Sequence, residues 1–121
     1  MKDIMDTLEY RGIKYPLIFN INVLTELQKR YGSFEDWAEK ILTDNGETDL
    51  EALLAGTTYM INEGIDVHNE EAKTEAEKLA PVTEKQTGRI LTAFGLNNAT
   101  DKILALISES NKPAGEQPKN A

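Results

Sequence analysis

The chain has 121 residues, a formal net charge of −8 at pH 7 and no cysteine. A chain of this length suits one domain, and the absence of cysteine excludes disulfides, zinc–thiolate sites and thiol nucleophiles, as in proteins of a reducing cytosol. The negative charge argues against nucleic-acid binding, no run approaches the ~18 apolar residues of a membrane span, and the first residues lack a secretory signal pattern.

The first predicted element is a β-hairpin over residues 7–19. Apolar and polar residues alternate in two runs on either side of Arg11-Gly12, a dipeptide that suits a tight turn. Pro16 lacks the N–H group that a sheet ladder uses, so its strand is expected at an edge. Because an isolated hairpin is marginal in water, its apolar face is expected to lie on the helices that follow.

Two amphipathic helices are predicted after the hairpin. Asn20 or Asn22 can cap the first helix, and Gly32 suits its C-terminal end. Ser33 can cap the second helix, which has the most regular amphipathic pattern in the sequence. The apolar positions of this second helix are Phe34, Trp37, Ala38, Ile41 and Leu42.

A third helix is predicted from Thr48 or Asp49 to Gly64, where glycine suits a C-terminal stop. It is apolar over more than one stripe, so we expect it to be the central and most buried helix. Residues 66–80 carry a thin apolar edge among many charged side chains. We therefore predict a fourth helix on the surface there, ended by Pro81.

A fifth helix is predicted from Thr83, with Gln86 in the position of a capping box, to Gly95. Gly88 inside it costs about 1 kcal/mol of helix propensity relative to alanine. We therefore expect either a close backbone contact at Gly88 or a weak helix.

A sixth helix is predicted from Asn98 or Thr100. The fold class is mainly α (α+β), a bundle of about six helices with a short N-terminal β-hairpin. Residues 1–107 are expected to form a single helical domain. Residues 108–121 contain two prolines, one glycine and no large apolar residue, and we predict a flexible C-terminal tail.

The order of these segments resembles that in the tail assembly chaperones of long-tailed bacteriophages and prophages, particularly those of Gram-positive hosts. The resemblance rests on residues 20–37 (NINVLTELQKRYGSFEDW), on Ile61-Asn62-Glu63-Gly64 near a helix end, and on residues 81–86 (PVTEKQ) before the last helices. It covers roughly residues 8–107, in order and at comparable spacing.

This resemblance implies a protein without catalytic activity or cofactor. Such chaperones bind the long, helical tape measure protein before and during polymerisation of the tail tube, keep it soluble, and are absent from the finished tail. The implied partners are the tape measure protein and the tail tube protein, in the cytoplasm of the bacterial host. Many are made in two lengths by a programmed frameshift, and the segment from Ser108 would suit the junction.

The residues expected to bind a partner lie on the last two predicted helices. If the hairpin and the first three helices complete the core, the apolar side chains of these helices are left as surface. Such a surface could hold an apolar stripe of a partner helix, and it also makes a homo-oligomer reasonable. The candidates are Ile90, Leu91, Phe94, Ile103, Leu104 and Ile107.

The sequence contains no recognisable catalytic or metal-binding constellation. His68 is the only histidine, and it is expected to be a surface residue because catalytic metal sites generally use three protein ligands. Asp44-Asn45-Gly46 lacks the ligands at both key positions of a calcium loop and is expected to be a turn. We therefore expect no metal and no enzyme activity.

Two other functions remain as alternatives. The six acidic residues from Glu63 to Glu77 would suit a small regulator that binds a basic partner, for example by mimicking DNA, although a solvated helix face explains them more simply. The protein could also be a structural component of the tail or of the head–tail junction. Trp37 and Phe34 could anchor a partner, but their spacing favours the core.

Overall fold

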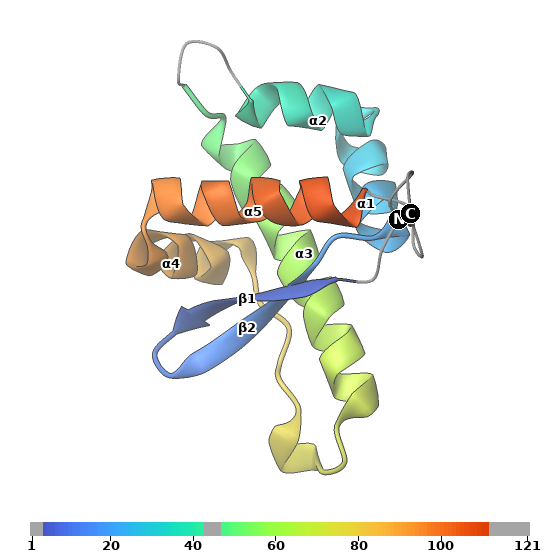
Figure 1. The fold of residues 1–121 in the computed structure, drawn as a ribbon, viewed down its shortest axis with the longest axis vertical. Coiled ribbons are helices and arrows are strands. Elements are labelled where there is room, and N and C mark those ends of the chain that lie inside the picture. Colours follow the sequence, from blue (N-terminus) through green and yellow to red (C-terminus); the bar gives the residue numbers. More distant parts are fainter. Residues whose placement is uncertain (1–3, 43–46, 112–121) are drawn as a thin grey trace, which may run out of the picture.

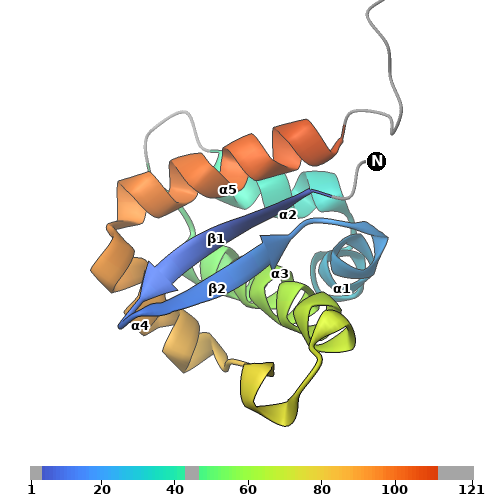
Figure 2. The same cartoon turned by 60° about the horizontal axis from the view of Figure 1, so that its bottom comes forward.

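A central helix organises the computed structural model, which describes residues 4–42 and 47–111. The hairpin and the last helix cross one side of this helix, α3, while α1 and α2 lie on one flank and α4 on the other (Figure 1, Figure 2). In chain order the elements are β1 (Met5–Tyr10), β2 (Ile13–Ile18), α1 (Ile21–Tyr31), α2 (Phe34–Ile41), α3 (Leu50–Glu71), a short 3₁₀ helix (Glu75–Glu77), α4 (Glu84–Phe94) and α5 (Leu96–Ser110).

The structure confirms the predicted hairpin. Arg11 and Gly12 form its turn with φ values of 52° and 79°, the sign that a type I′ turn requires. The strands pair antiparallel, with Thr7 opposite Pro16. Because this sheet has two strands within the described residues, Pro16 stands in an edge strand, as predicted.

Side-chain caps fix four of the helix starts at positions that the sequence indicates. Thr83 and Gln86 form the predicted capping box, in which the Thr83 hydroxyl accepts from the Gln86 N–H (3.1 Å) and the Gln86 side chain accepts from the Thr83 N–H (2.8 Å). In the other three starts, a side-chain oxygen accepts the N–H of the third helical residue. These caps are Asn20, Ser33 and Asp49.

The predictions that α3 ends at Gly64 and that a separate helix spans residues 66–80 are wrong. α3 continues to Glu71, and the chain beyond it is irregular apart from the 3₁₀ turn. Gly64 is buried in the helix, and a Cβ added there would lie 2.8 Å from the Pro16 main chain. The glycine therefore permits close contact with β2 rather than ending the helix. The described residues contain five α-helices rather than six.

Two asparagines of α3 hold the irregular segment that returns to α4. Asn69 donates to the Leu79 carbonyl and accepts from the Leu79 N–H, both at 2.9 Å. Asn62 forms the same pair of hydrogen bonds with Val82, at 3.0 and 2.8 Å. These side chains satisfy main-chain groups that a helix would have paired internally, which is why an extended segment is stable there.

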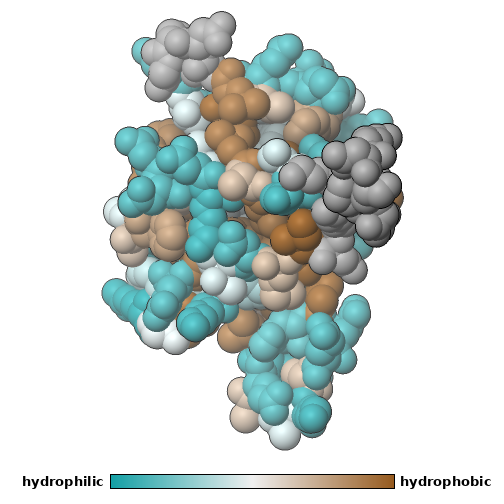
Figure 3. Space-filling model, viewed as in Figure 1, coloured by the Kyte–Doolittle hydropathy of each residue, from teal (hydrophilic) through white to brown (hydrophobic). Residues whose placement is uncertain are grey.

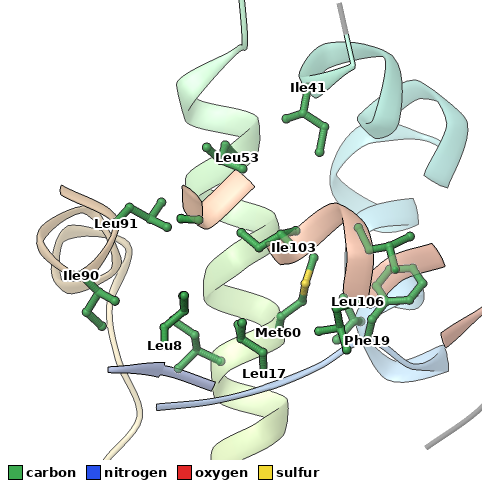
Figure 4. Packing of buried hydrophobic residues seen from close by; sticks show 14 of the residues in the cluster. Leu8, Leu17, Phe19, Ile41, Leu53, Met60, Ile90, Leu91, Ile103 and Leu106 are labelled. Carbon is green, nitrogen blue, oxygen red and sulfur yellow. The ribbon is translucent and has the colours of Figure 1, made fainter. Parts of the chain in front are cut away.

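Trp37 belongs to the core, as its spacing predicted. Its side chain is fully buried, and its indole Nε1 donates to the Ala52 carbonyl at 2.8 Å. A Cβ added at Gly56 would lie 2.3 Å from the indole ring, so this glycine lets α2 approach α3 closely. Further along α3, Met60 meets side chains of the hairpin and α5, including Leu17 and Ile103 (Figure 4).

The last helix differs from the prediction at both ends. α5 begins at Leu96, directly after Gly95 (φ 98°), without a side-chain cap from Asn98 or Thr100. It ends at Ser110, which is buried, so residues 108–110 belong to the helix rather than to the predicted tail. The rest of that predicted tail from residue 112, and the predicted turn at residues 44–46, lie outside the described residues.

None of the helices in residues 4–42 and 47–111 combines the length and apolar character needed to cross a membrane.

Gly64→Ala is expected to lower the free energy of unfolding by about 1–3 kcal/mol, because the added methyl group meets main-chain atoms of Pro16. Urea denaturation measures the change. Gly88→Ala is the matched control: its Cβ would meet only Leu54 Cδ2, at 3.6 Å, and the better helix propensity of alanine should raise stability by up to about 1 kcal/mol. Equal effects of the two changes would contradict the close contact at Gly64.

Candidate functional site

Most of the residues predicted to bind a partner lie in the core. Ile90, Leu91, Ile103 and Ile107 are at most 7% exposed. Their predicted exposure is wrong because α4 and α5 pack on the hairpin and α3 and so contribute to the core (Figure 4). Phe94 and Leu104 are half-buried.

Three of the six exposed large apolar side chains in the described residues are leucines near helix ends, and the other three are Met5, Ile13 and Ile21. Leu42 follows α2, Leu50 begins α3 and Leu96 begins α5, with exposed fractions of 57%, 55% and 43%. Figure 3 shows hydrophobic surface beside the grey residues that separate α2 from α3. These leucines were not among the predicted binding residues, although Leu42 and Leu50 stand beside the polar residues 43–47 in the sequence.

Leu50 and Leu96 border a groove between the first turns of α3, the second half of α4 and the start of α5. The groove encloses about 210 Å³. We call it the leucine groove, and its lining residues are Leu50, Leu53, Leu54, Gly88, Leu91, Thr92 and Leu96. Such a concave surface can take up an apolar side chain or one face of a helix, and it has no group suited to chemistry.

A wider, more polar hollow continues the leucine groove past Leu50 and Leu96. It adds the carboxylates of Glu47 and Asp101, together with Thr48, Asn97 and Thr100. The groove is therefore apolar along its floor and acidic at one end. A ligand that fits both parts would be apolar with basic groups beside the apolar stripe.

Gly88 keeps the floor of the leucine groove open. The prediction offered a close backbone contact or a weak helix at this position. The structure shows no close backbone contact there, and the weak helix stays a prediction. α4 is a continuous helix through Gly88, and the nearest neighbour of an added Cβ would be the Leu54 side chain at 3.6 Å. An alanine would fit there. No contact within the described residues requires glycine at this position, although glycine has a lower helix propensity than alanine.

A charged network joins α1 to α3 and α4, two of the three helices that border the leucine groove. Arg30 donates to Glu84 of α4 at 2.7 Å and to Glu51 of α3. These hydrogen bonds, with a further one to the Tyr59 hydroxyl, raise the pKa of Arg30 above its ordinary value. The guanidinium links α1 to α3 and α4 by charge-assisted hydrogen bonds at a partly exposed position.

Tyr31 is held in its neutral form by the same network. Its partial burial and the hydrogen bond that it donates to Glu51 (2.9 Å) raise the pKa of the phenol above its ordinary value. A phenol with a raised pKa cannot act as a base near neutral pH. The cluster is thus a structural contact between helices.

No described residues form a group of three or more His, Cys, Asp or Glu side chains that could hold a metal ion. His68 lies near the end of α3, where its Nε2 is 2.7 Å from the Glu77 carbonyl oxygen. In the acidic run, Glu63 accepts from the Asn20 and Asn22 amides at 2.8 and 2.9 Å. The rest of this run lies on the last turns of α3 and the segment beyond, the hydrophilic lower end in Figure 3.

Comparison of the chain with protein-family models, curated proteins and solved structures gives no match. A functional assignment therefore depends on the geometry of the chain's own surfaces.

Tyr31→Phe is expected to reduce the loss of stability at alkaline pH. The raised phenol pKa means that the folded protein holds this proton more tightly than the unfolded chain. The resulting stability is present below about pH 10 and is lost as the pH rises above it. Urea unfolding at about pH 8 and about pH 10.5 compares the two proteins. An equal loss of stability in both would contradict this role of Tyr31.

Proposed function

We propose that this protein is a non-catalytic tail assembly chaperone of a phage or prophage, and that it holds an apolar stripe of the tape measure protein in the leucine groove. The observation that carries the proposal is an open apolar groove bordered by two exposed leucines, Leu50 and Leu96. The resemblance to tail assembly chaperones suggests the tape measure protein as the partner, and the leucine groove is the surface where we expect it to bind.

The apolar lining of the leucine groove suits an anchor side chain of an amphipathic helix. Such a helix presents apolar anchors at intervals of three, four and seven residues, and a groove between helices can receive them. Leu50 and Leu96 are about half exposed (55% and 43%), so covering each one stabilises the complex by about half of the ~1.5–3 kcal/mol for burying a fully exposed leucine. An unassembled tape measure protein, as the resemblance implies, would expose stripes of this kind.

The charge of the protein fits the same role. A net charge of −8 repels other copies of the complex and keeps it in solution. Glu47 and Asp101, beside the leucine groove, favour a partner helix with basic residues next to its apolar stripe. The charge therefore serves both solubility and the choice of partner.

A chaperone acts before its client is assembled. The proposal therefore places the protein in the host cytoplasm and leaves it out of the mature particle, where a structural tail component would remain. Mass spectrometry of purified particles separates these two roles. Contact with the tail tube protein and self-association are separate expectations, and self-association through the leucine groove would compete with the tape measure protein.

The acidic-regulator alternative uses a different surface. Its acidic residues run from Glu63 to Glu77, along the end of α3 opposite Leu50 and into the segment beyond it. Variants of the leucine groove therefore separate the two functions: they should abolish binding by a chaperone and leave binding by an acidic regulator intact.

Leu50→Glu combined with Leu96→Glu is expected to weaken binding of the cognate tape measure protein by at least about tenfold, because the apolar contact is replaced by two charges. Co-expression followed by affinity capture and a binding titration measures the effect. Both residues are the first of their helices, where glutamate suits the helix dipole, so the fold should be retained.

Ile21→Glu is the matched control. Ile21 is also the first residue of a helix and is 69% exposed, but it does not line the leucine groove. Binding should be unchanged in this variant. Equal weakening by Ile21→Glu, or the absence of a complex between the unaltered protein and its cognate tape measure protein, would contradict the proposal.

A further inference from the structure

Two of the cations without an ion pair, Arg11 and Arg89, lie at one hollow in this acidic protein. Within residues 4–42 and 47–111, the lysines and arginines that form ion pairs are Lys29, Arg30, Lys40, Lys78 and Lys102. Five others in the same ranges form none. Of these, Arg11 and Lys14 lie at the hairpin turn, Lys85 and Arg89 lie on α4, and only Lys73 lies elsewhere.

The hairpin turn lies beside α4 in both views of the fold (Figure 1, Figure 2). Between them is a hollow of about 280 Å³ that we call the arginine hollow. Arg11 and Arg89 line it, and the Arg11 guanidinium carbon lies 5.3 Å from the centre of the Tyr10 ring. Its remaining lining residues are Tyr15, Gln86 and Ile90.

Two features of the arginine hollow disfavour folding without a ligand. Arg11 has φ 52°, a backbone conformation that arginine adopts at a cost and that asparagine or glycine would adopt more easily. Lys85 and Arg89 are one turn apart on α4, so like charges stand side by side. Neither feature is offset by an ion pair within the described residues. An anion bound beside Arg89 would lessen this repulsion and would give the Arg11 guanidinium a partner.

We propose that the arginine hollow binds a carboxylate-rich segment of a partner protein. Each guanidinium offers two parallel N–H donors that match a carboxylate, and the hydroxyls of Tyr10 and Tyr15 and the amide of Gln86 can donate further hydrogen bonds. The hollow is large enough for one or two acidic side chains, and the aromatic rings can contact their methylene groups.

The net charge favours an acidic peptide over a nucleic acid as the ligand. A nucleic acid carries charge along its whole length and would be repelled by the rest of a surface with net charge −8. Salt screens charges beyond about 8 Å at physiological ionic strength, so a short acidic segment responds mainly to the guanidinium groups nearest to it.

This inference is independent of the tape measure proposal. The arginine hollow shares no lining residue with the leucine groove. On α4, Gln86, Arg89 and Ile90 line the hollow, whereas Gly88, Leu91 and Thr92 line the groove. The two sites can therefore be tested separately.

An NMR titration of the full chain with a short peptide that carries two adjacent glutamates between neutral residues tests the proposal. Amide signals of the hairpin turn and of the α4 residues that line the arginine hollow should shift. Arg11→Asn and Arg89→Gln should each weaken binding about tenfold or more, because each removes a charge-assisted hydrogen-bond donor. Asparagine suits the backbone at the turn, so Arg11→Asn should lose binding while its melting temperature stays the same or rises.

Lys73→Gln is the matched control, since it removes one unpaired positive charge outside the arginine hollow. It should change affinity less than twofold, roughly the effect of net charge alone at physiological salt. No shift with the glutamate peptide, equal weakening by Lys73→Gln, or stronger binding of a single-stranded oligothymidine of eight nucleotides would overturn the proposal.

Discussion

The fold depends on how closely its neighbours approach the main chain of α3. At Gly56 the Trp37 indole occupies the space of a side chain, and at Gly64 the Pro16 main chain does the same. The two glycines lie eight positions apart along the helix, so one fixes α2 and the other fixes the hairpin. A larger residue at either position would push away an element to which others are attached. The hydrogen bond from Trp37 to the Ala52 carbonyl fixes the orientation of the indole ring against α3, in a contact that is otherwise apolar.

The candidate binding surface follows from this arrangement. α4 and α5 pack over the hairpin and the middle of α3, so their apolar side chains become part of the core. The first turn of α3 extends beyond them, and α5 begins abruptly at Gly95 without a polar cap. Leu50 and Leu96 are thus both exposed at helix starts, with Gly88 leaving space between them. The surface is apolar because of where the core ends, rather than because one helix is unusually hydrophobic.

Local signals in the sequence were sufficient to predict much of the fold. Asn20, Ser33, Asp49 and Thr83 cap helices through hydrogen bonds within four residues, and Arg11-Gly12 forms its turn locally, so each could be predicted without knowledge of the tertiary structure. The role of Gly64 could not, because it depends on Pro16, far away in the sequence. The segment after Glu71 was predicted wrongly as a helix. It is extended because Asn62 and Asn69 of α3 form hydrogen bonds with its main chain, and such bonds from another element leave no local signal in the sequence. The exposure of Ile90 and Ile103 was predicted wrongly for a related reason: spacing shows that they face an apolar surface, but only packing decides whether that surface is the core.

The central claim is that a partner helix occupies the leucine groove, and methyl NMR tests it most directly. A helical fragment of the cognate tape measure protein would be added to protein with labelled leucine and isoleucine methyl groups. The account predicts shifts concentrated at Leu50, Leu54, Leu91 and Leu96, with Ile13 and Ile21 unchanged. Shifts confined to residues outside the groove, or no shift on addition of the fragment, would contradict it.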